Sequence, residues 1–223
     1  MSKFKIHLVA AAVNFFSFSL FGQGSALNFN PTLITGLYTY RPVDTKESNP
    51  LLIPDITIDK NKFYTELRYN YDYINTSAVY VGKIISLSKK PEQTLIPQIG
   101  WLNGDYKGVS LQFYYQFIGP EFEINFQNQY GIAFNKIPDF YFNWSDMQFP
   151  ITKKIKLGNS IQIRSDNALT TLDFGLFLVY TPEKWTLAFY SFDFYNLARR
   201  FFVLEIQRAL SFKINRNHPN FYK

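Results

Sequence analysis

Cysteine and histidine, which carry most nucleophilic and metal-binding chemistry in proteins, are scarce in this 223-residue sequence. It contains no cysteine, and its two histidines are His7 and His218. A chain without cysteine has no thiolate nucleophile and no cysteine-ligated metal. A Ser-His-Asp relay needs a well-placed histidine, whereas His218 lies close to the C-terminus. Glu121 and Glu123 form a carboxylate pair, but that spacing is common by chance. We therefore expect no catalytic residue, no metal site and no cofactor.

Nucleic-acid binding is also not expected. The formal net charge is +6, and the basic residues do not cluster with stacking aromatic residues. The small groups Lys153-Lys154 and Arg199-Arg200 are too short to form such a patch. No glycine-rich phosphate-binding loop is present either.

The charged residues that could act together recur at alternate positions of several segments. Alternation predicts that they share one face, and five of them are acidic and five basic: Glu66, Arg68, Asp72, Glu123, Lys154, Lys156, Arg164, Asp173, Glu205 and Lys213. If that face lines a barrel, all but Lys154 and Lys213 are our lumen-lining candidates. Charges of one sign would indicate a selective pore, whereas a balanced set indicates a network of ion pairs. The alternative is a narrow polar pore with Glu66, Arg68, Glu123 and Arg164 at its constriction.

These charges must be positioned by β-strands, because the sequence alternates between apolar and polar residues with a period of two. In Phe63–Asp72, residues such as Phe63 and Leu67 fall on one face and Glu66 and Arg68 on the other. A helix would mix these residue types around its circumference. The same alternation is found in Val109–Phe117, Phe122–Phe134, Lys154–Arg164, Leu169–Tyr180 and the segment from Phe202 to Lys213.

Strand length and aromatic content favour a transmembrane β-barrel. Several predicted strands have the roughly 9–11 residues that cross a bilayer, with one apolar face and one polar face. Aromatic residues make up 19% of the chain, and many lie near predicted strand ends, where membrane barrels place girdles of amphipathic rings. Our candidates for these girdles are Trp101, Trp144, Trp185, Tyr130 and Tyr180.

The number of strands is predicted to be twelve. Turn-forming residues separate ten strands between Phe63 and Ile214, and Thr32–Arg41 is an eleventh. Single-chain bacterial barrels have an even number of strands, so Leu51–Ile58 becomes the twelfth by pairing with Thr32–Arg41. The alternative is ten strands, with residues 23–61 forming a periplasmic or lumenal segment.

The N-terminus is typical of a secretory signal peptide. Lys3 and Lys5 precede an apolar stretch from Leu8 to Phe21, which is too short to span a bilayer, and Gly22 offers a cleavage point. We expect residues 1–22 to be removed, leaving residues 23–223 as one barrel domain with residues 215–223 as a tail.

Two segments carry a family resemblance: FYTELRYNYDYINTS (Phe63–Ser77) and FYFNWSD (Phe140–Asp146). They resemble strands of the small, mostly uncharacterised outer-membrane β-barrel proteins of Gram-negative bacteria, and the likeness in pattern covers the whole mature chain. Many such barrels end in phenylalanine, whereas this chain ends Phe221-Tyr222-Lys223. The resemblance implies a location in the outer membrane and contact with its lipid. It also implies a narrow porin-like channel, open to small polar solutes, or a structural or accessory membrane protein. The oligomeric state is not indicated.

A soluble secreted or periplasmic β-barrel that binds an apolar ligand is the alternative of a different class. Its apolar faces would point inward, with Phe122, Phe126 and Phe134 inside a closed core. Polar residues that break the alternation bear on this choice: Lys83, Asn128, Asn159 and Arg208 fall on the apolar face. Either these residues lie near the membrane interfaces, or a bulge shifts the register of the strand, or the barrel is not in a membrane.

Overall fold

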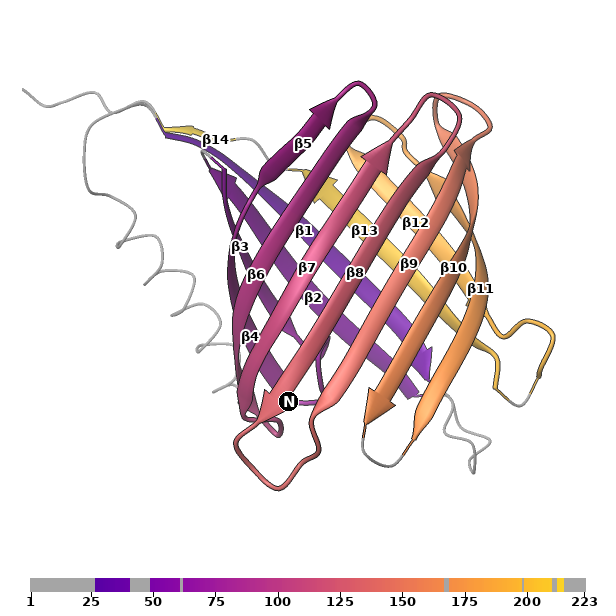
Figure 1. Ribbon diagram of the computed structural model, residues 1–223. Coiled ribbons are helices and arrows are strands. Elements are labelled where there is room, and N and C mark those ends of the chain that lie inside the picture. Colours follow the sequence, from indigo (N-terminus) through magenta and orange to yellow (C-terminus); the bar gives the residue numbers. More distant parts are fainter. Residues whose placement is uncertain are drawn as a thin grey trace, which may run out of the picture. The chain divides into compact units, whose positions relative to one another are not determined.

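The computed structural model describes residues 27–40, 49–60, 62–166, 169–197, 199–209 and 212–214, and all regular secondary structure in these ranges is β-strand. The chain divides into two compact units, of which the larger, Phe29–Phe212, contains most of the sheet described below (Figure 1). The predicted signal peptide and C-terminal tail lie outside the described residues. Within these residues, no helix is long and apolar enough to cross a membrane.

Twelve strands follow one another around the sheet. They are β1 (Leu27–Tyr40), β2 (Asn49–Lys60), β3 (Phe63–Tyr69), β4 (Thr76–Lys83), β6 (Glu92–Gly104), β7 (Gly108–Ile118), β8 (Glu123–Ala133), β9 (Phe140–Pro150), β10 (Ile155–Asp166), β11 (Thr170–Tyr180), β12 (Trp185–Phe192) and β13 (Phe201–Ala209). A short strand, β5 (Ile85–Lys89), extends the line of β4 and pairs with β6, and β14 covers Phe212–Ile214.

Each of the twelve strands pairs antiparallel with its neighbours, and β13 pairs with β1 from Thr32↔Ala209 to Thr39↔Phe202, so the strand order returns to its start. The predicted twelve-stranded antiparallel architecture is confirmed. The ten-strand alternative is wrong, because β1 and β2 pair from Asn30↔Asp59 to Tyr40↔Asn49 as members of the sheet.

The barrel wall is apolar on the outside, and along β6 and β7 it is polar on the inside. Along β6, Ile99 and Trp101 are 53% and 58% exposed, whereas the alternating Gln98 is only 6% exposed. Along β7, Leu111 is exposed and Gln112 is buried. This order is the reverse of a soluble barrel, and Phe134, which a soluble barrel would enclose, is 61% exposed. The soluble alternative is therefore not favoured.

The two ends of the barrel differ in turn length. At one end, upper in Figure 1, the turns after β2, β5, β7, β9 and β11 each have four residues or fewer, and we call it the short-turn end. At the other, the long-turn end, four of the six connections have six residues or more. β1 begins and β13 ends at the short-turn end.

Glycines on the inner wall make room for aromatic rings from adjacent strands. Four such pairs are register partners: Gly100 with Tyr80, Gly131 with Phe140, Gly158 with Phe177 and Gly175 with Phe192. A Cβ at any of these glycines would come within 2.7 Å of a ring atom. The rings therefore lie directly on the backbone of the neighbouring strand. A side chain at any of these four positions would collide with the ring.

The polar residues that break the outer apolar face take different positions. Arg208, near the end of β13, places its guanidinium 4.7 Å from the ring centroid of Trp185, its register partner. Lys83 ends β4 at the short-turn end. Asn128 lies in the middle of β8 and bonds to Tyr141 and Asn143 on β9. Asn159 lies half-buried in β10. Arg208 and Lys83 thus lie near strand ends. Asn128 instead lies within its strand, where its side-chain oxygen accepts hydrogen bonds from the neighbouring strand β9.

Candidate functional site in the barrel interior

Arg68 is the centre of the polar interior. Its side chain has 0% exposure, and its guanidinium faces three carboxylates. The Nε atom lies 2.7 Å from Glu66 Oε1 and 3.9 Å from Asp55 Oδ2, and a terminal nitrogen lies 3.4 Å from Asp72 Oδ1. Charge pairs that are excluded from water interact far more strongly than exposed pairs. The structure therefore brings together three of the predicted lumen candidates, Glu66, Arg68 and Asp72, and adds Asp55.

Arg68 also reaches strand β7, and through Gln112 it is linked to β8. It donates hydrogen bonds to Gln112 Oε1 (3.0 Å) and to the Tyr114 hydroxyl (2.9 Å), and Gln127 donates to the same Gln112 oxygen (3.2 Å). The guanidinium lies over the rings of Tyr71 and Tyr80, at 4.4 and 4.5 Å from their centroids. These contacts join β3 to strands that lie several positions away around the barrel.

The β3–β4 turn, Asn70–Asn75, inserts side chains into the interior from the long-turn end. The Tyr71 hydroxyl donates to Gln127 Oε1 at 2.7 Å, and its ring meets Phe142 on β9 edge-on at 6.1 Å. Asp72 Oδ1 accepts hydrogen bonds from the Tyr80 hydroxyl (2.7 Å) and from Gln129. Burial raises the pKa of the Tyr71 hydroxyl, which therefore stays protonated.

This turn is held by its two asparagines. Asn70 and Asn75 have φ of 63° and 54°, a left-handed region that asparagine tolerates better than most residues. The backbone N–H of Asn75 donates to the Asn70 side chain at 2.8 Å, and the Asn75 side chain donates to Asp105 at 2.9 Å. The sequence pattern predicted that the strand continues to Asp72, whereas β3 ends at Tyr69. Asp72 nevertheless reaches the interior, because the β3–β4 turn bends into the barrel and brings the Asp72 side chain to Tyr80 and Gln129.

Aromatic residues fill the interior along β9 to β13. Trp144, Phe177, Tyr190, Phe192 and Val203 form a buried cluster. Trp144 is 9% exposed and packs edge-on against Tyr190 and Phe192. Its expected place in an outer aromatic girdle is therefore wrong, because the alternation in β9 puts Trp144 on the inner face. The other four girdle candidates, Trp101, Tyr130, Tyr180 and Trp185, are all at least 40% exposed.

Asp146 is a half-buried carboxylate that the sequence analysis missed. It accepts hydrogen bonds from Trp144 Nε1 (2.8 Å), Ser160 Oγ (2.5 Å) and the Tyr190 hydroxyl (3.2 Å). Asp146 and Trp144 are two residues apart on β9 and therefore lie on the same face. If Trp144 were on the outer wall, Asp146 would be there too. The polar pair Asp146 and Gln148, two residues apart, was the signal that could have placed this face inside.

The remaining lumen candidates form separate groups. Lys156 Nζ lies 2.7 Å from Glu123 Oε2, and Gln148 donates to the same carboxylate. Asp173 pairs with Arg199 at 2.9 Å. Arg164 donates to Gln162 at 2.9 Å and lies 5.9 Å from the ring centroids of Phe142 and Phe201.

Glu205 lies half-buried on the inward face of β13. Glu123 and Arg164 thus have contacts that differ from those of Glu66 and Arg68, so the four residues of the predicted constriction do not form one cluster. Lys154 lies exposed in the β9–β10 turn.

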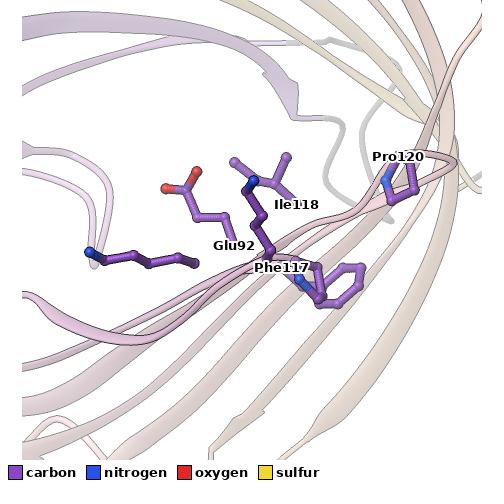
Figure 2. A pocket seen from close by; sticks show the side chains of 7 residues that line it. Glu92, Phe117, Ile118 and Pro120 are labelled. Atoms are coloured by element: carbon purple, nitrogen blue, oxygen red, sulfur yellow. The ribbon is translucent and has the colours of Figure 1, made fainter.

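A surface hollow of about 510 Å³ lies at the short-turn end (Figure 2). It is lined by the β5–β6 and β7–β8 turns, including Lys89, Lys90, Glu92 and Pro120. The β3–β4 turn is at the opposite end of the barrel, so this hollow is distinct from the Arg68 cluster. Among the described residues, no group of acidic residues and histidines has the geometry of a metal site.

Solved structures show what this arrangement of strands resembles. The KdgM porin superposes with a TM-score of 0.55 at 8% sequence identity, covering 81% of this chain and 99% of that one. The fold is therefore similar to that of solved porins. The KdgM porin in complex with disordered oligogalacturonate gives the same values, and the NanC porin matches with a TM-score of 0.55, 9% identity and coverage of 81% and 100%. No protein-family model matches this chain, and no curated protein matches its sequence.

Proposed function

We propose that this chain is an integral outer-membrane β-barrel that acts as a narrow porin-like channel for small polar solutes, without catalysis. The observation that carries the proposal is the inverted wall. Apolar side chains such as Leu111 and Leu176 are exposed on the outside, where hydrocarbon would cover them, while glutamines and charged residues are buried inside. The similar folds of the KdgM and NanC porins support it.

The proposed orientation follows from the ends of the barrel. Outer-membrane barrels have short periplasmic turns and longer extracellular loops. The short-turn end, where β1 begins and β13 ends, would face the periplasm. The β3–β4 turn would then enter the lumen from outside the cell, as a constriction folded into the barrel.

The proposed solutes are small and polar. The oligogalacturonate in the similar KdgM structure is a saccharide, which supports a polar cargo for this fold. Hydroxyl and amide groups of Tyr71, Gln112 and Gln127 could exchange their mutual hydrogen bonds for bonds to such a solute. The proposed lipid partner is the outer membrane itself.

One observation favours a second function, that of a structural or accessory barrel closed by its own interior. The Arg68 side chain has no exposure to solvent, and Gln129 and Glu66 are at most 2% exposed. A cluster packed this closely, bridged to Phe142 by Tyr71, could act as a permanent plug.

Two measurements test the proposal. Heat-dependent migration of the detergent-extracted protein on SDS gels is expected for a folded membrane barrel, and a protein found only in the soluble periplasmic fraction would contradict it. Discrete conductance steps in planar bilayers are expected for the channel. A folded, membrane-inserted barrel that stays silent would support the structural function instead.

A further inference from the structure

The cluster around Arg68 has more acidic than basic groups. Within 4 Å of this one guanidinium lie Asp55, Glu66 and Asp72, whereas its other partners, Gln112 and Tyr114, are neutral. One positive charge therefore faces three carboxylates, which leaves a surplus of two negative charges. If two of the carboxyls share a proton, the surplus is still one negative charge.

Buried oxygen atoms that lack hydrogen-bond partners indicate which kind of ion the negatively charged cluster would bind. Each of the three carboxylates has one buried oxygen with no hydrogen-bond partner: Asp55 Oδ1, Glu66 Oε2 and Asp72 Oδ2. Gln98, 94% buried on the inner face, has no partner for either side-chain atom, and it is the register partner of Gln112 in this cluster. A buried polar atom that lacks a hydrogen-bond partner destabilises the folded state. A cation with its hydration water would satisfy such oxygens, whereas an anion would be repelled.

The other charged groups of the interior do not reverse the net negative charge of the Arg68 cluster. Lys156 is matched by Glu123, and Arg199 by Asp173 and Asp193. The Asp146 carboxylate accepts only from neutral donors. Arg164 is the remaining described cation of the inner wall, and the half-buried Glu205 offsets it in number. The interior as a whole is therefore acidic.

Lysines at the short-turn end favour anions over cations, but their effect is weaker than that of the buried carboxylates. Five lysines lie exposed in its turns or at a strand end beside them: Lys89, Lys90, Lys153, Lys154 and Lys184. Exposed charges are screened within about 8–10 Å at physiological ionic strength, whereas buried charges are screened much less. The sign of the narrowest part of a pore then decides which ions pass.

We propose that the cluster of Asp55, Glu66 and Asp72 around Arg68 makes the lumen selective for small cations over anions. The inference rests on the channel function proposed above. It names the charge class of the permeant solute, which that function leaves open.

Reversal potentials measured across planar bilayers under a KCl gradient test the inference. The wild-type protein is expected to favour K⁺ over Cl⁻ by about threefold or more. Glu66→Gln and Asp72→Asn are each expected to lower this ratio, and the double variant is expected to bring it to one or below. Glu121→Gln removes a carboxylate from an exposed turn and serves as the matched control, with an unchanged ratio expected. Heat-dependent gel migration confirms that each variant is folded.

The outcomes separate the two proposals. No conductance from a folded, inserted wild-type barrel would overturn the channel function, and the inference with it. If the wild-type protein conducts with a K⁺ to Cl⁻ permeability ratio at or below one, cation selectivity alone is overturned. The wild-type measurement is sufficient for this conclusion. A cation preference that survives the folded double variant would overturn the assignment to the Arg68 cluster.

Discussion

The ring of Tyr80 lies on the backbone of Gly100, its register partner on β6, so closely that a Cβ at position 100 would come within 2.3 Å of Cε1 of the ring. The same ring stacks under the Arg68 guanidinium at 4.5 Å, and its hydroxyl donates to Asp72. Gly100 is therefore a structural requirement of the Arg68 cluster, because a larger residue would displace the ring that supports it.

Gly100→Ala is expected to lower the free energy of unfolding by about 1–3 kcal/mol, the usual cost of overpacking. Unfolding in urea, followed in lipid vesicles, measures this change. Ile99→Ala, on the exposed outer side of the same strand, tests whether any substitution in β6 has this effect. In a Tyr80→Ala background the cost of Gly100→Ala should largely disappear, since the clashing ring is gone. An equal cost in both backgrounds would rule out the ring as the cause.

Tyr71→Ala is expected to increase single-channel conductance several-fold, because it removes the side chain that spans from the β3–β4 turn to Gln127 and Phe142. Tyr73→Ala is the matched control from the same turn, since Tyr73 is 41% exposed and contacts Tyr106 instead. Current recordings in planar bilayers compare the two. Equal conductance in Tyr71→Ala and wild type would mean that the turn does not form the constriction.

Asp146→Leu is expected to destabilise the barrel by about 2–4 kcal/mol, because it removes the acceptor of three hydrogen bonds, donated by Trp144, Ser160 and Tyr190. Ser160→Ala removes only one of these donors and is expected to cost about 1 kcal/mol. Urea unfolding followed by tryptophan fluorescence measures both variants. A smaller loss for Asp146→Leu than for Ser160→Ala would contradict the hydrogen-bonded role of Asp146.

The fold could be predicted from the sequence because period-two alternation directly reports which residues share a face. This is how Glu66 and Arg68 were placed together, as the structure confirms. Trp144 was misplaced because aromatic residues occur on both sides of this wall, so residue type alone does not decide the face. The insertion of Tyr71 and Asp72 could not be predicted, because their alternation continues that of β3 and only the left-handed Asn70 diverts the chain.

A charge placed on the outer wall tests where the membrane lies. Leu204 and Arg208 share the outer face of β13, one within the strand and the other near its end. Arg208 lies over the Trp185 ring, a contact worth about 0.5–1 kcal/mol at an exposed site, so Arg208→Leu should change stability little. Leu204→Arg would place a charge in hydrocarbon and should cost about 2–4 kcal/mol. Urea unfolding in phospholipid vesicles compares the two variants. If Leu204→Arg costs no more than Arg208→Leu, the face of β13 that carries Leu204 is not in contact with lipid.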